Sequence, residues 1–127
     1  MSIVRDVMST KLVVVQPGAT VAEAATVMGE RHVGSTLVME GDDLVGIFTE
    51  RDIVRALSQD FDAPGHSLSQ WMTREPKTIT PDTPVEEALN VMLAGGFRHL
   101  PVTEGGAVIG VVSMRDISKA TAAESSS

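Results

Sequence analysis

The sequence predicts a mixed α/β (α+β) fold built from two tandem copies of one β-α-β-β-α unit. Shifting the sequence by 64 positions aligns residues 4–56 with residues 68–120, and 15 of the 53 aligned pairs are identical. The strand and helix signals also follow the same order in both copies. The chain has 127 residues, 43% of them hydrophobic, and a unit of about 50 residues rarely encloses a core alone. We therefore expect the two copies to pack as one module with pseudo-two-fold symmetry.

The repeat divides the chain into four segments. The first copy covers residues 1–58 and the second covers residues 68–120. Residues 59–67 between them are rich in Asp, Pro, Gly and Ser, a composition typical of an exposed linker. Residues 121–127 are small and polar, so we expect a flexible tail.

The local signals assign the elements of each copy in order. A short β-branched run, at 12–15 and again at 78–79, predicts a strand. Thr20 and Glu23 then form a capping box, and Pro84 suits the first position of a helix. Apolar residues at helical spacing follow. Two strands around a glycine turn, at 36–48 and 100–112, predict a hairpin, and short helices over 50–57 and 114–120 end the copies.

Charge and composition exclude several classes of function. Seventeen acidic against 10 basic residues give a net charge of −7, which disfavours nucleic acid and anionic membranes as partners. No apolar run reaches the roughly 20 residues that a membrane span needs. The chain has no cysteine, which is most simply explained if the protein is cytoplasmic. The three histidines are scattered, and we expect no metal site.

Two short motifs are the strongest candidates for a binding site. Thr49 with Asp52, and Ser113 with Asp116, follow the second hairpin strand and open the last helix of each copy. The same spacing has two interpretations. The hydroxyl and carboxylate can cap the helix, or a carboxylate at this helix start can hold the hydroxyls of a sugar while the helix attracts an anion. The spacing alone leaves both interpretations open.

Together with the repeat, these motifs resemble a CBS-domain pair, also called a Bateman module. The resemblance covers about residues 4–120. In the first copy it rests on V-x-P-x-x-T-V-x-x-A from Val15 and on G-I-F-T-E-R-D-I at 46–53. In the second copy it rests on T-I-T-P-D-T-P-V-E-E-A at 78–88, F-R-H-L-P-V at 97–102 and G-V-V-S-M-R-D-I at 110–117.

The resemblance implies a site for an adenosine-containing ligand in the clefts between the repeats. AMP, ADP, ATP, S-adenosylmethionine and NAD(H) are the candidates. Asp52 and Asp116 would hold ribose hydroxyls, and Thr49 and Ser113 would contact ribose or phosphate. The remaining positions implied by the family are Val14, Val15, Thr78 and Ile79 along the adenine, Arg98 and His99 at the phosphates, and Leu100 and Pro101 as support for the base.

The two copies differ at the basic pair. Gly34 and Ser35 occupy the positions that correspond to Arg98 and His99. Arg31 and His32 lie three residues earlier, at the expected end of a helix. We therefore expect unequal sites, with the second copy better suited to a phosphate.

By this resemblance the protein is a stand-alone regulatory sensor and not an enzyme. No nucleophile–base pair and no phosphate-cradling loop is visible in the sequence. We expect no required cofactor, an adenine nucleotide as regulatory ligand, a homodimer, and a separate regulated protein as a further partner. The alternative is an interaction module that keeps the fold for dimerisation or docking and has degenerate clefts that bind no ligand.

Overall fold

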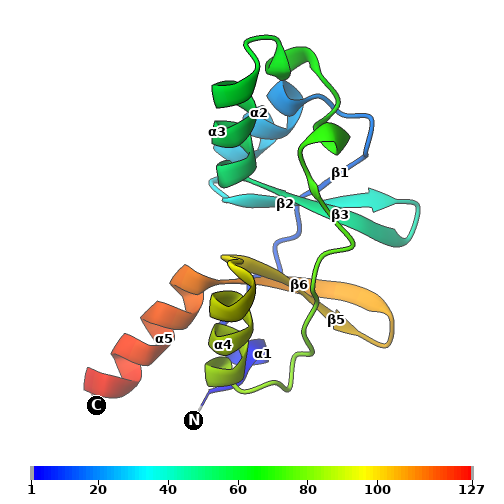
Figure 1. Ribbon diagram of the computed structural model, residues 1–127. Coiled ribbons are helices and arrows are strands. Elements are labelled where there is room, and N and C mark those ends of the chain that lie inside the picture. Colours follow the sequence, from blue (N-terminus) through cyan, green and yellow to red (C-terminus); the bar gives the residue numbers. More distant parts are fainter. Residues whose placement is uncertain (1, 127) are drawn as a thin grey trace. The chain divides into compact units, whose positions relative to one another are not determined.

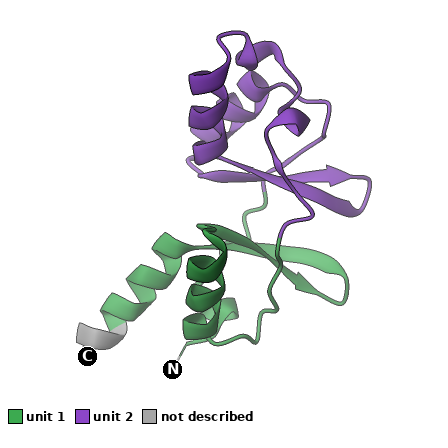
Figure 2. Ribbon diagram, viewed as in Figure 1, with its two compact units in different colours: residues 1–12, 77–127 green, residues 13–76 purple. Residues whose placement is uncertain are grey.

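The computed structural model describes residues 2–126 and confirms two repeats of mixed α and β structure (Figure 1). The compact units do not coincide with the sequence repeats (Figure 2). Unit 2 consists of residues 13–76, and unit 1 combines residues 1–12 with residues 77–127. Residues 1–12 therefore pack with the second repeat, although the repeat alignment assigns them to the first copy.

Unit 2 contains a four-stranded sheet with two α-helices on one face (Figure 1). The strands lie in the order β1 (Val14–Val15), β2 (Ser35–Glu40), β3 (Asp43–Thr49) and β4 (Thr73–Arg74), with β1 parallel to β2 and the other pairs antiparallel. The helices are α2 (Val21–Arg31), α3 (Glu50–Gln59) and the short 3₁₀ helices η1 (Ala63–Gly65) and η2 (Leu68–Gln70). Val21, Ala24, Met28, Val38, Phe48, Leu68 and Met72 form the core of this unit.

Unit 1 is built around the β-hairpin of the second repeat. Its elements are α1 (Val4–Val7), α4 (Val85–Gly95), β5 (His99–Glu104), β6 (Ala107–Ser113) and α5 (Met114–Ser126). The expected first strand is reduced to a single parallel bridge between Ile79 and Val102. The core consists of Val4, Ile79, Val85, Ala88, Met92, Leu100, Val102, Val112 and Ile117.

Residues 1–12 and 63–76, which we call the crossing segments, make equivalent contacts in the two units. The Val4 N–H donates to the Thr83 carbonyl over 2.8 Å, and the Leu68 N–H donates to the Ala19 carbonyl over 2.8 Å. A shift of 64 positions places Val4 on Leu68 and Ala19 on Thr83, so the two hydrogen bonds are equivalent. Each unit is therefore completed by a segment that the repeat alignment assigns to the other copy, residues 4–12 in unit 1 and residues 68–76 in unit 2.

The crossing segments also satisfy the first turn of the long helices. The Val85 N–H at the start of α4 donates to the Ser2 carbonyl over 3.1 Å, and the Val21 N–H of α2 donates to the His66 carbonyl over 3.0 Å. The N–H groups of a first helical turn have no partner within the helix. In both units a carbonyl of a crossing segment thus accepts a hydrogen bond from one of these N–H groups.

Two glycines that recur in the repeat mark the closest approach of these segments. A Cβ atom on Gly110 would lie 2.8 Å from the Met8 Sδ and 2.9 Å from the Ser9 carbonyl oxygen. A Cβ atom on Gly46 would lie 2.6 Å from the Met72 Sδ. The recurring Met and Gly positions therefore make the same packing contact in both units, between Met8 and Gly110 in unit 1 and between Met72 and Gly46 in unit 2.

Three local expectations differ from the structure. Residues 59–67 contain η1 and the buried Ala63, because this stretch begins a crossing segment. Helix α5 continues through the expected tail to Ser126, with the Thr121 hydroxyl donating to the Ile117 carbonyl over 3.0 Å; Ser127 lies outside the described residues. Pro84 is the N-cap of α4 and not its first helical residue.

Candidate functional site

The Ser-x-x-Asp motif of the second repeat lies at the junction of β6 and α5. The Ser113 N–H donates to the Asp116 Oδ2 over 3.0 Å, and the Asp116 N–H donates to the Ser113 Oγ over 3.0 Å. This reciprocal pair is a capping box, so the capping interpretation holds. It engages only one carboxylate oxygen: within residues 2–126, no donor reaches the Asp116 Oδ1. The half-buried carboxylate can therefore accept a further hydrogen bond from a ligand.

The start of β5 lies beside this motif. His99 is the register partner of Ser113 across the hairpin. The carbonyl of the preceding Arg98 accepts a hydrogen bond of 2.8 Å from the Met114 N–H at the start of α5. The Arg98 side chain is exposed and His99 is half-buried. One end of this hairpin thus carries a guanidinium, an imidazole, a hydroxyl and a carboxylate.

Residues 78 and 79 run along the free edge of β5. The Ile79 N–H donates to the Pro101 carbonyl over 3.0 Å, and the Thr103 N–H donates to the Ile79 carbonyl over 2.9 Å. Ile79 and Leu100 belong to the core cluster of unit 1, and Pro101 is buried as well. Of the four residues expected around the adenine in this repeat, Thr78 is the one with an exposed side chain.

The first repeat places its motif in the same way at the junction of β3 and α3. The Thr49 N–H and Oγ1 both donate to the Asp52 Oδ2, over 2.9 and 3.1 Å, and the Asp52 N–H donates back to the Thr49 Oγ1 over 3.4 Å. Here the second carboxylate oxygen is also engaged, because the Arg55 Nη2 donates to the Asp52 Oδ1 over 3.2 Å. Asp52 is only 7% exposed, so its carboxylate is less accessible than that of Asp116.

The strand expected to line the first site is β1. Val14 and Val15 pair in parallel with Leu37 and Val38 of β2. Val14 is 50% exposed, whereas Val15 is half-buried and packs against the core of unit 2. Val14 is therefore the residue of this pair that can meet a ligand with its side chain.

The register confirms that Gly34 and Ser35 are the structural counterparts of Arg98 and His99. Ser35 pairs with Thr49 across the first hairpin. The Glu50 N–H donates to the Gly34 carbonyl over 3.1 Å, in the same way as the Met114 N–H in unit 1. Helix α2 ends at Arg31, and His32 caps it with a φ of 55°. The basic pair of the second repeat is thus replaced by two uncharged residues in the first.

Sequence reasoning missed the environment of Arg55. Its guanidinium also donates to the Trp71 carbonyl and lies 5.8 Å from the centroid of the Trp71 ring. The spacing of Asp52 and Arg55, three residues apart on one helix, was a usable signal for an ion pair. The contact with Trp71 could not be read from the sequence, because Trp71 reaches this helix only through the crossing segment.

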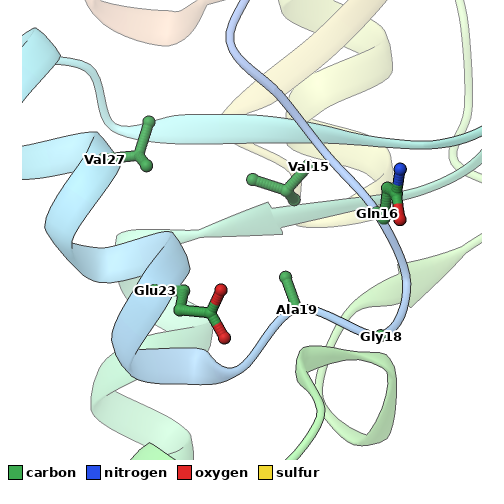
Figure 3. Close-up of a pocket in the computed structure, with 6 residues that line it drawn as sticks. All are labelled: Val15, Gln16, Gly18, Ala19, Glu23 and Val27. Atoms are coloured by element: carbon green, nitrogen blue, oxygen red, sulfur yellow. The ribbon is translucent and has the colours of Figure 1, made fainter.

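A separate pocket of about 490 Å³ lies in unit 2 between β1 and α2 (Figure 3). Val15, Gln16, Gly18, Ala19, Glu23 and Val27 line it. Neither Thr49 nor Asp52 borders this pocket. The Glu23 carboxylate accepts a hydrogen bond of 3.2 Å from the Thr20 N–H, as the capping box predicted by the sequence requires.

Among the described residues, no three His, Asp or Glu side chains gather in a group that could hold a metal ion. None of the helices described for residues 2–126 combines the length and the apolar character that crossing a membrane requires.

The chain is similar to many known proteins. A sequence model of the CBS domain matches residues 4–59 and 68–123. An uncharacterized 17.7 kDa protein of Acidianus ambivalens is 45% identical over 120 residues, which cover 92% of this chain and 71% of the relative. The CBS domain-containing protein YhcV of Bacillus subtilis is 33% identical over 92% of this chain and 84% of the relative. The protein CBSCBSPB2 of Arabidopsis thaliana is 37% identical over 87% of this chain, which spans 21% of that relative.

Solved structures give the same result. The CBS-domain containing protein ATU1752 of Agrobacterium tumefaciens superposes with a TM-score of 0.89 at 30% identity, over 94% of this chain and 99% of the other. The CBS domain pair of protein MJ0100, solved in complex with 5′-methylthioadenosine and S-adenosyl-L-methionine, has a TM-score of 0.87 at 26% identity, over 97% and 98% of the two chains. CBSX2 in complex with AMP has a TM-score of 0.81 at 25% identity, over 98% and 99%. With both repeats matched by the family model and by these structures, the chain is a tandem pair of CBS domains and belongs to the CBS-domain family.

Proposed function

We propose that this CBS pair is a regulatory module that binds an adenosine-containing ligand, with Asp116 holding the ribose hydroxyls. One observation carries the proposal: the capping box of α5 leaves one oxygen of a half-buried carboxylate without a partner among the described residues. A hydrogen bond to a charged acceptor contributes about 1.5–3 kcal/mol. Two adjacent ribose hydroxyls match the acceptor geometry of such a carboxylate.

The surroundings of Asp116 suit the other parts of a nucleotide. The exposed Arg98 and the N-terminus of α5 both favour an anion such as a phosphate. Thr78, on the edge of β5, supplies an exposed side chain beside the strand for the base. The related structures support the ligand class, because 5′-methylthioadenosine, S-adenosyl-L-methionine and AMP share the adenosine group.

The proposed mechanism is binding without chemical change of the ligand. A ligand that binds one conformation better than another shifts the population toward it, and the shift can be read by a second protein. We propose a separate regulated protein as that reader and the cytoplasm as the setting. Nucleic acid and membrane are not proposed as partners, because the net charge is −7.

Isothermal titration calorimetry tests the proposal. We expect at least one of AMP, ADP, ATP, S-adenosylmethionine and NAD to bind at micromolar concentration, with the strongest binding at one site for each chain. Guanosine monophosphate is the control, because it has the same ribose and phosphate with a different base. Absence of binding by all five adenosine compounds at millimolar concentration would contradict the proposed function.

A second candidate function is an interaction module with degenerate sites. Two observations in unit 2 favour it for that unit: Gly34 and Ser35 replace the basic pair, and Arg55 engages the carboxylate of Asp52. Unit 1 has neither feature, which is why we place ligand binding first. This second function would follow if the titrations showed no binding while the protein still self-associated.

We also propose a homodimer, on the basis of the exposed apolar side chains of α3 and the loop after it. Val54, Leu57 and Phe61 are 67%, 48% and 99% exposed. Val54 and Leu57 lie three residues apart on one face of α3. Apolar side chains exposed side by side favour association, and a two-fold dimer is the commonest form. We expect light scattering to give twice the mass of 13.4 kDa, and the variant Leu57→Glu to shift the protein toward the monomer. Gln70→Glu, which adds the same charge at an exposed position of unit 2, should leave the mass unchanged.

A further inference from the structure

We propose that Arg55 is the residue that makes the two ribose sites unequal, because its guanidinium occupies the acceptor of Asp52 that a ligand hydroxyl would use. The inference rests on the proposed function, in which the aspartate of each motif receives the ribose. It concerns unit 2 alone, and it predicts a site that is intact but closed by a side chain of the same chain.

The hydrogen bonds of Asp52 show how the site is closed. Its Oδ2 is held by two donors of Thr49, and its Oδ1 is held by the Arg55 Nη2. The carboxylate side chain is 9% exposed, so little of it is left for an incoming hydroxyl. A ribose hydroxyl that approaches the Oδ1 therefore competes with the guanidinium for this oxygen.

Arg55 is positioned by three contacts. Its Nη2 donates to the Asp52 carboxylate and to the Trp71 carbonyl, and its guanidinium carbon lies 5.8 Å from the centroid of the Trp71 ring. Only an arginine combines a planar group that lies over an indole with several donors in a fixed arrangement. The Arg55 side chain is nevertheless 47% exposed. It can therefore move into solvent without disrupting a core, as a reversible occupant must.

Unit 1 lacks each part of this arrangement at the corresponding positions. A shift of 64 residues replaces Arg55 with Lys119 and Trp71 with Val7. In the part of the chain that the structure describes, Lys119 makes no ion pair with Asp116. A lysine has no planar fork, and valine offers no ring. The Asp116 Oδ1 is therefore available without the displacement of any side chain.

The ligand and Arg55 thus compete for one oxygen in unit 2. The ion pair and the cation–π contact of an exposed arginine are each weak. Removal of the competitor is therefore expected to raise the affinity of the unit 2 site about 3- to 10-fold. Displacement also separates the guanidinium from Trp71, which is the single tryptophan of the chain. Its fluorescence is consequently expected to change when a ligand displaces Arg55 in unit 2.

The test is an AMP titration of the wild type and three variants, read by calorimetry and by tryptophan fluorescence. Arg55→Lys keeps the charge and removes the fork, and Arg55→Gln removes the charge as well. Both variants should bind AMP about 3- to 10-fold more tightly at the weaker site, with unchanged affinity at the stronger site. Arg74→Gln removes an exposed cation from the same unit and should behave like the wild type.

The outcomes separate this inference from the proposed function. If the wild type binds AMP at the stronger site and both Arg55 variants leave the weaker site unchanged, the inference is wrong and the proposed function stands. If neither the wild type nor any variant binds AMP, and the other four adenosine compounds also fail to bind the wild type, the proposed function is wrong and the inference fails with it. A wild type whose tryptophan fluorescence stays unchanged while the weaker site is filled would also overturn the assignment of that site to unit 2.

Discussion

Replacement of Asp116 by asparagine is expected to weaken the binding of AMP about 10- to 100-fold. The change removes a charged acceptor whose hydrogen bonds contribute about 1.5–3 kcal/mol, and each 1.4 kcal/mol corresponds to a factor of ten. Asparagine keeps the size of the side chain and one oxygen that can accept from the Ser113 N–H. The start of α5 should therefore remain capped, and calorimetry with AMP measures the loss directly.

The control is the same substitution in the other repeat. Asp52→Asn should leave the affinity of the stronger site unchanged, because the Asp52 carboxylate is already engaged by Thr49 and Arg55. Circular dichroism at the titration temperature verifies that both variants are folded. The opposite pattern, with a large loss for Asp52→Asn and none for Asp116→Asn, would show that unit 2 carries the primary site.

The largest expected effect on stability comes from Gly110→Ala. The added Cβ would lie 2.9 Å from the carbonyl oxygen of Ser9, which itself accepts a hydrogen bond of 2.9 Å from the Val111 N–H. The positions of the Cβ atom and of the Ser9 carbonyl oxygen are both fixed by the backbone, so no side-chain rotation can relieve this contact. Inserting an extra carbon into such a contact costs about 1–3 kcal/mol. Urea denaturation should show that decrease in the free energy of unfolding.

Gly29→Ala is the matched substitution. Gly29 lies within α2, and nothing within 4 Å of its position would meet a Cβ atom. Alanine in a helix is favoured over glycine by about 0.5–1 kcal/mol, so this variant should be slightly more stable than the wild type. If Gly110→Ala were equally harmless, the packing of the first crossing segment against β6 would be contradicted.

The elements that rest on local signals could be predicted from the sequence. The capping box of Thr20 and Glu23 starts α2 at Val21 as expected, and the glycine turns place both hairpins. The Ser/Thr-x-x-Asp motifs lie where the spacing placed them, at the starts of α3 and α5. Each of these features depends on residues within a few positions of one another, and such interactions are encoded directly in the spacing.

The features that could not be predicted depend on contacts between distant parts of the chain. The repeat aligns residues 4–12 with residues 68–76, but an alignment does not say which unit either segment packs against. The engagement of Asp52 likewise required knowledge of where Trp71 lies. The burial of Ile79 and Leu100 follows from the packing of α4 and β5 in unit 1, and alternation in so short a run does not reveal which face is covered.

The nested connectivity of the units sets an order for folding during synthesis. Residues 13–76 form an uninterrupted stretch, whereas unit 1 needs residues 1–12 together with residues 77–127. The ribosome releases all of unit 2 before it releases β5, so unit 2 can fold while residues 1–12 still lack their partners. Long-range closure of this kind is slow. The unit that carries the proposed primary ligand site is therefore the last to form, and a nascent chain acquires that site only after α5 has been made.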